Sequence, residues 1–115
     1  PDPRSEKAAI HHVTRFLRKS GYSVRSRELD GCGYDLHASG DTNELHVEVK
    51  GCNGPLARFF ISRREMASAK ADGAWRLAVV TNASNKPTRP QLLTYAQMEE
   101  SFDLEPIQWA GNARG

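Results

Sequence analysis

The stretch ELHVEVKGC, residues 44–52, decides the fold that we expect of this chain. Leu45, Val47 and Val49 recur at every second position, which is the pattern of a β-strand with one buried face. The positions between them carry charged or ionisable side chains: Glu44, His46, Glu48 and Lys50. A core strand usually alternates apolar residues with small or neutral ones, so the charged face of this strand needs a chemical explanation.

The segment before this strand is its expected partner. GDTN, residues 40–43, is a turn-forming sequence, so we expect an antiparallel hairpin of residues 33–38 and 45–50. With Asp41 and Thr42 at the tip, one face carries only apolar pairs: Ala38 with Leu45, Leu36 with Val47, and Tyr34 with Val49. The other face pairs Asp35 with Glu48, His37 with His46, and Gly33 with Lys50. A slip of one residue would mix the two faces, so the pattern itself favours this register.

Helices are predicted before and after the hairpin. Residues 9–17 carry apolar side chains at helical spacing, and Asp2 or Ser5 can cap the start of that helix. SRRE, residues 62–65, has the form of a capping box and opens a helix that ends near Gly73. We expect further strands at 22–29, 58–61, 75–81 and 91–95, a short helix at 96–102 and an extended piece at 105–109. This order predicts an α/β or α+β fold with helices on the faces of a sheet.

The composition limits the class of protein. The 115 residues fit one domain, and 38% hydrophobic with 26% charged residues is a soluble globular composition. No apolar run approaches the roughly 18–20 residues that span a bilayer, and the polar N-terminus is unlike a signal peptide. With only two cysteines, Cys32 and Cys52, we expect free thiols and a cytoplasmic location. The chain does not begin with Met, so we expect it to be part of a larger protein.

Basic residues concentrate in the middle of the chain. Residues 53–90 contain seven Lys or Arg against two acidic residues, although the net charge of the whole chain is only +2. Such a segment is typical of a polyanion-binding face, but charge alone fits a solvated helix face equally well. If the partner is DNA, backbone N–H groups after Ser62 help bind phosphates. The side chains expected to contact phosphates are Arg58, Arg63, Arg64 and Lys70.

The charged face of the hairpin holds the candidate chemistry. Asp35 and Glu48 meet as cross-strand neighbours, and Lys50 lies two residues from Glu48 on the same face. Two facing carboxylates repel each other unless a divalent cation lies between them, and Mg²⁺ prefers one or two carboxylates with waters and a phosphate. Lys50 would then orient the attacking water or neutralise charge on the phosphate. Spacing alone, however, favours ordinary charges on a solvated sheet face.

A family resemblance changes that balance. GYDL (33–36), followed by HVEVKG (46–51), resembles the PD-(D/E)XK nuclease superfamily. More narrowly, residues 5–110 resemble the domain at the C-terminus of the plant NO VEIN protein and in bacterial restriction- and helicase-linked proteins. The resemblance implies a restriction-endonuclease-like fold, with a central mixed sheet flanked by helices and an antiparallel hairpin that carries the active site. One departure is Tyr34, which stands where the superfamily motif often has proline.

The same resemblance implies roles for individual residues. Asp35 and Glu48 would be metal ligands, and Lys50 would be the catalytic lysine. The backbone carbonyl of Val49 and the side chain of Glu6, on the first helix, would be further ligands. The implied cofactor is Mg²⁺, which Mn²⁺ can replace.

Together, the residues and the resemblance predict a metal-dependent endonuclease that cuts DNA, as the cleavage module of a larger restriction or defence protein. The first alternative is a catalytically inactive nucleic-acid-binding module of the same fold. The second is a structural or protein-interaction domain. Sequence specificity, strand preference and oligomeric state, a homodimer included, stay open.

Two histidines face each other beside the candidate site in this register. His37 and His46 could contact a phosphate or a bound water, but surface histidines near a polar cleft explain them without any role. His11 and His12 are adjacent on a helix and point about 100° apart, so they cannot form a zinc pair.

Overall fold

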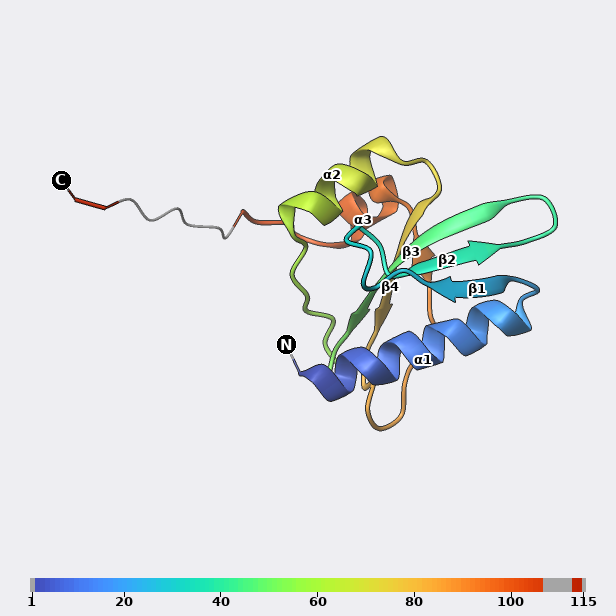
Figure 1. The fold of residues 1–115 in the computed structure, drawn as a ribbon. Helices are drawn as coiled ribbons and strands as arrows, with labels where there is room; N and C mark the ends of the chain where they lie inside the picture. Colours follow the sequence, from blue (N-terminus) through green and yellow to red (C-terminus); the bar gives the residue numbers. More distant parts are fainter. Residues whose placement is uncertain (1, 107–112, 115) are drawn as a thin grey trace.

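The structure, a computed structural model, describes residues 2–106 and 113–114. In this part of the chain, five strands form one mixed sheet in the order β1-β2-β3-β4-β5, as Figure 1 shows. Neighbouring strands run antiparallel, except that β3 and β4 are parallel. The elements are α1 (Pro3–Lys19), β1 (Ser23–Ser26), β2 (Leu36–Ser39), β3 (Glu44–Gly51), α2 (Arg63–Ala71), β4 (Trp75–Val80), β5 (Leu92–Leu93) and α3 (Tyr95–Ser101).

Helices cover both faces of the sheet (Figure 1). α1 lies along one face, where Ala9, Val13 and Leu17 pack on buried side chains of β2, β3 and β4. α2 and α3 cover the opposite face, where Ala69 and Met98 belong to a second buried cluster with Trp75 and Leu77 of β4. The predicted mixed sheet flanked by helices is therefore confirmed. None of the helices in the described residues is long and apolar enough to cross a membrane.

The caps of α1 and α2 are local features that the sequence predicts. Asp2, rather than Ser5, is the N-cap of α1, because its carboxylate accepts a hydrogen bond from the Arg4 N–H at 3.0 Å. Ser62 and Glu65 form both hydrogen bonds of the predicted capping box at the start of α2. These caps set where each helix begins, and α2 begins beside the end of β3.

The hairpin of β2 and β3 forms in the predicted register. Leu36 lies opposite Val47, His37 opposite His46, and Ala38 opposite Leu45. The apolar pairs of this ladder are buried under α1. Because successive side chains of a strand point to opposite faces, the ionisable residues of β3 lie on the side that α2 and α3 cover.

The first residues of the hairpin differ from the prediction. β2 begins at Leu36 rather than at Gly33, because Gly31 and Gly33 have φ angles of 62° and 87° and turn the chain there. Tyr34 was expected to pair with Val49 on the apolar face, and this expectation is wrong. Its ring packs instead with the cluster under α2 and α3.

Other predicted strands are shorter or missing. Residues 58–61 form no strand: both neighbours of β3 and of β4 are already in place, so the segment from β3 to α2 crosses the sheet face. Phe59 packs on Phe102 there, whereas Phe60 is 63% exposed. The strands expected at 22–29 and 91–95 are reduced to β1 and β5, and α3 starts one residue earlier than expected. In the expected piece 105–109, the first two residues are not in a strand and the rest lie outside the described residues.

Candidate active site

β3 places a glutamate and a lysine side by side under α2. Glu48 is a buried carboxylate, with only 3% of its surface exposed. The Nζ atom of Lys50 lies 3.2 Å from Oε2 of Glu48. Both side chains point to the same face because they are two residues apart in a strand. This is the charged face that the alternating sequence of β3 predicts.

Asp35 is the residue directly before β2, and its side chain reaches the same place. Its backbone N–H donates to the Val47 carbonyl at 2.9 Å, which continues the β2–β3 ladder by one bond. Its carboxylate Oδ2 accepts a hydrogen bond from the Val49 N–H at 2.8 Å. These two bonds hold Asp35 at the end of the ladder, beside Glu48 and on the same side of the sheet. The Asp35 carboxylate is near enough to raise the pKa of Glu48, so the two carboxylates approach each other as predicted.

The two carboxylates are poorly compensated. Burial first, and the neighbouring Asp35 carboxylate second, raise the pKa of Glu48 to about 9 against the opposing effect of Lys50. Burial also raises the pKa of Asp35, although the Val49 N–H and Lys50 act in the opposite direction. Desolvated carboxylates that share one site favour protonation or a bound cation. Hard, anionic oxygens in this arrangement fit Mg²⁺ or Mn²⁺.

The Val49 carbonyl is available as an additional oxygen donor. In a strand, the N–H and C=O of one residue point to the same side. The Val49 N–H points to the β2 side, where it meets Asp35, so its carbonyl points there as well. The ladder ends at the pair Leu36–Val47, and in the described part no hydrogen bond outside the ladders reaches this carbonyl. The placement is consistent with the predicted ligand role of Val49.

Lys50 is held as a cation between two glutamates. Its Nζ lies 3.0 Å from Oε1 of Glu65, in addition to its contact with Glu48. Burial lowers the pKa of Lys50, but Glu48 and Glu65 together raise it by more, so its net shift is upward. The ammonium group therefore keeps its proton and donates hydrogen bonds into the site.

Glu65 also belongs to the site, although its sequence pattern predicts only a capping role. Oε1 of Glu65 accepts from the Ser62 N–H at 2.9 Å and also binds Lys50. Burial raises the pKa of Glu65, but the Ser62 N–H and Lys50 lower it by more, so the carboxylate stays ionised. The capping box was the only signal in the sequence, and the contact with Lys50 depends on how α2 packs over β3.

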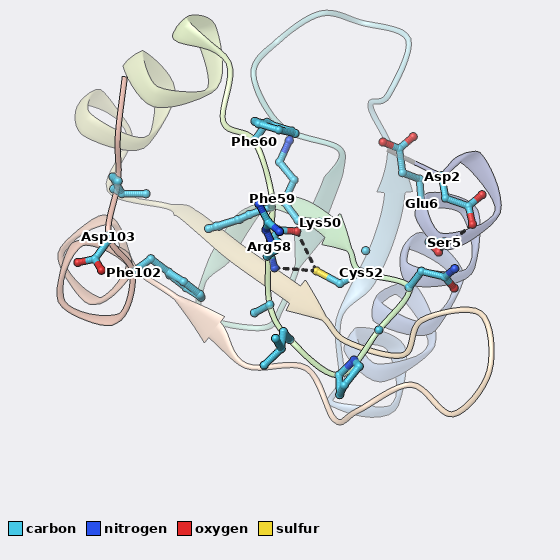
Figure 2. A pocket seen from close by; sticks show the side chains of 17 residues that line it. Asp2, Ser5, Glu6, Lys50, Cys52, Arg58, Phe59, Phe60, Phe102 and Asp103 are labelled. Carbon is cyan, nitrogen blue, oxygen red and sulfur yellow. Dashed lines mark hydrogen bonds between the residues drawn. The ribbon is translucent and has the colours of Figure 1, made fainter. Parts of the chain in front are cut away.

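α1 crosses the end of β3 at very short range. A Cβ atom on Gly51 would lie 2.3 Å from the backbone oxygen of Ser5 and 2.8 Å from the Ala9 side chain, so only glycine fits. Glu6 follows Ser5 and therefore lies near the Lys50 end of the strand. Figure 2 shows Glu6 and Lys50 on different sides of the same cavity. The described structure shows no contact between Glu6 and Asp35 or Glu48, so it does not bring this predicted ligand to the carboxylates.

The cavity has a volume of about 810 Å³ and opens beside Lys50 (Figure 2). Its wall includes the start of α1, the segment from Gly51 to Phe60, and residues 102–104. Asp35 and Glu48 are not part of this wall, so the cavity adjoins the carboxylate pair through Lys50. Cys52 is a buried free thiol whose sulfur accepts from the Arg58 N–H at 3.4 Å and thereby holds the segment that carries Arg58.

The four predicted phosphate contacts are divided between two places. Arg58 lines the cavity, whereas Arg63, Arg64 and Lys70 are exposed on α2, outside it. Arg63 and Lys70 are seven residues apart and share one helix face. The Arg64 guanidinium already donates to the Gly31 carbonyl at 2.8 Å.

Comparison with known proteins identifies the family. The family described as Protein NO VEIN, C-terminal, matches residues 5–94, a range that contains most of α1, every element from β1 to β5, and the residues Asp35, Glu48 and Lys50. No curated protein and no solved structure matches the chain. The family match covers well over half of the chain, and it includes α2, most of α1 and all five strands. The chain therefore belongs to the family of the C-terminal domain of protein NO VEIN.

Proposed function

We propose that this domain is a divalent-metal-dependent endonuclease that hydrolyses DNA phosphodiester bonds. The observation that carries the proposal is the convergence of Asp35, Glu48 and Lys50 on one face of the hairpin. One buried and one partly buried carboxylate, both with raised pKa values, lie beside a single lysine, and a divalent cation would neutralise their negative charge. The resemblance to the PD-(D/E)XK nucleases supports the same roles for the same residues.

The residues of the chain have separable tasks in this proposal. A bound Mg²⁺ would polarise the scissile phosphate and lower the pKa of a water. Asp35, Glu48 and the Val49 carbonyl would hold the ion on the hairpin. Lys50, protonated and reached from the cavity, donates to the attacking water or to the charge that develops on the phosphate. Glu65 fixes the direction of the lysine side chain.

DNA is proposed as the substrate because cationic and aromatic groups surround the entrance. Arg58 lines the cavity next to Lys50, and the exposed ring of Phe60 lies at its edge (Figure 2). Arg63 and Lys70 continue the positive charge along α2. Phosphates bind such groups mainly by charge, and unstacked bases bind aromatic rings. Membership of a family named for a C-terminal domain supports the further proposal that the nuclease acts alongside other domains, as in a restriction or defence protein.

One observation favours the catalytically inactive binding module as the second candidate. Lys50 is bound by two carboxylates, Glu48 and Glu65, so its positive charge already interacts with groups of the protein itself. An active site needs this lysine to turn from Glu65 or Glu48 toward a phosphate. The two proposals therefore differ in what Lys50 does when metal and DNA bind.

Cleavage of supercoiled plasmid in Mg²⁺ or Mn²⁺ separates the two candidates. We expect nicked or linear product from the wild-type chain and a loss of about 10²–10³-fold in rate for Lys50→Ala, as when one preorganised charge donor is removed. Lys19→Ala, which removes a lysine from the far end of α1, is the matched control and should cut normally. Equal rates for Lys50→Ala and wild type would refute the catalytic role. Metal binding without cleavage in any divalent ion would support the binding module.

A further inference from the structure

A second group of ionisable side chains lies at the other end of the same hairpin face. The Nε2 atom of His37 lies 3.0 Å from Oε2 of Glu44, and the Nε2 atom of His46 lies 3.3 Å from Oε1 of the same carboxylate. One ligand atom from each of the three residues can be chosen so that all lie within 4.8 Å of one another. His37 and His46 are a direct cross-strand pair of β2 and β3, so the ladder sets their approach.

The outer nitrogens of both histidines are already held. Nδ1 of His46 lies 2.5 Å from Oδ2 of Asp72, at the end of α2. Nδ1 of His37 lies 3.5 Å from the Tyr34 hydroxyl, and the Tyr34 ring stacks on His46 with centroids 4.5 Å apart. Both Nε2 atoms therefore point toward Glu44. Histidines that bind a metal show this arrangement, with one nitrogen on the ion and the other bound to a carboxylate or another polar group.

The donor set differs from that of the candidate active site. Two imidazoles and one carboxylate suit Zn²⁺ and related transition metals, whereas Mg²⁺ prefers oxygen alone. Around a tetrahedral ion with bonds of about 2.0–2.1 Å, neighbouring ligand atoms are roughly 3.4 Å apart. The observed N···O separations of 3.0 and 3.3 Å, one to each oxygen of Glu44, are close to that value, and the three ligand atoms lie within 4.8 Å of one another.

We propose that His37, Glu44 and His46 form a transition-metal site of the Zn²⁺ class, separate from the carboxylate pair, with Asp72 as a positioning residue. Half of the Glu44 side chain is exposed, so an ion has a path from solvent and an open position for water or an anionic oxygen. A bound ion links β2 to β3 and, through Asp72, to α2. This site is made of side chains that the proposed nuclease chemistry does not use, so an experiment can refute one of the two proposals and leave the other intact.

Calorimetric titration with Zn²⁺, in excess Mg²⁺ to occupy the carboxylate pair, tests the site. We expect one equivalent to bind the wild-type chain, and His37→Ala and His46→Ala to weaken binding by more than tenfold. Asp72→Asn should lower affinity about 10–100-fold, the usual effect of losing a partner of a ligating histidine. His11→Ala removes an exposed histidine of α1 and is the matched control. Circular dichroism of each variant verifies the fold, and Glu44→Gln gives a further variant at an exposed position.

Co²⁺ provides an independent readout of geometry. We expect the intense visible absorption of four-coordinate Co²⁺ with the wild-type chain and with Glu48→Gln, but not with His46→Ala. Loss of the Zn²⁺ and Co²⁺ signals in Glu48→Gln would overturn the proposal, because the ion would then belong to the carboxylate pair. No binding at all, or equal binding by His37→Ala, His46→Ala and wild type, would show that the cluster is only a hydrogen-bonded network.

Discussion

The two ends of the hairpin's ionisable face differ in burial and in donor chemistry. At one end Glu48 is 3% exposed and shares its site with Asp35, so desolvation and repulsion govern its protonation. At the other end the Glu44 side chain is 53% exposed and two imidazoles replace the second carboxylate. Within one strand of eight residues, the same alternating pattern therefore produces two clusters with different donor sets, oxygen alone at one end and nitrogen with oxygen at the other. Glu48 lies inside β3, between β2 and β4, whereas Glu44 is the first residue of β3 and precedes the pairing with β4, which begins at His46.

The largest expected effect is the separation of the two metal sites by substitution. Glu48→Gln should weaken Mn²⁺ binding at the carboxylate end by about 100-fold or more, since a direct ligand contributes at least as much as the partner of a ligand. The same variant should change Zn²⁺ affinity at the histidine end less than twofold. Calorimetry with each ion measures both. If one substitution abolishes the binding of both ions, the two ends form a single site.

The next effect tests how tightly α1 packs against the end of β3 that follows Glu48 and Lys50. Gly51→Ala places a methyl group 2.3 Å from the Ser5 backbone oxygen, and backbone cannot move aside as a flexible side chain can. We expect a loss of about 1–3 kcal/mol in the free energy of unfolding, which is typical of overpacking. Urea denaturation measures it, and Gly54→Ala is the control, because a Cβ there meets no atom within 4 Å. Equal stability of the two variants would mean that α1 does not hold the end of β3 tightly.

A smaller effect concerns pH and stability without metal. The pKa of Glu48 in the folded chain, about 9, is above its ordinary value of 4.5. Between these two pH values the folded state retains a proton that the unfolded state has lost. The stability that this group contributes in its protonated form is therefore fully present below about pH 4.5 and is lost as pH rises through 9. Glu48→Gln has no carboxyl group to lose a proton, so it does not lose stability in this way as pH rises. Its melting temperature in chelator should exceed that of wild type by about 4 °C or more near pH 8.

The advantage of Glu48→Gln should shrink as pH falls toward 5, because wild-type Glu48 is then protonated. Glu100→Gln, an exposed position on α3, should show no such pH-dependent difference. A Glu48→Gln variant that is less stable than wild type at pH 8 would contradict the origin assigned to the raised pKa.

The smallest effect concerns the basic residues outside the cavity. Arg63→Ala and Lys70→Ala should each weaken DNA binding slightly and reduce the slope of log affinity against log salt by about 1, if each contacts one phosphate. Arg64→Ala should change the slope less, because its guanidinium is bound to the Gly31 carbonyl. Fluorescence anisotropy over a series of salt concentrations measures the slopes. An unchanged slope for Arg63→Ala would identify α2 as an ordinary solvated helix.

Local features were predictable where all the residues that form them lie within one short segment of the chain. The caps of α1 and α2 depend on side chains within three residues of the backbone groups that they bind. The register of β2 and β3 was predictable because a slip of one residue would expose every apolar side chain of the ladder. The prediction for Tyr34 was wrong for a related reason. The turn at Gly31 and Gly33 breaks the period of two, so the Tyr34 side chain lies on the face opposite to the one expected.

The sequence by itself determined the charged strand face, the hairpin register and the convergence of Asp35, Glu48 and Lys50, because the period of a strand and its turn are local properties. Only the tertiary structure decided what surrounds that face. The packing of α2 places Glu65 on Lys50 and Asp72 on His46, across 15 and 26 residues of sequence. No spacing rule links such residues, since their contact depends on how helices pack on a completed sheet. In the assembled sheet Glu48 is buried, whereas Glu44, at the start of β3, stays half exposed, so one strand face has two chemically different ends.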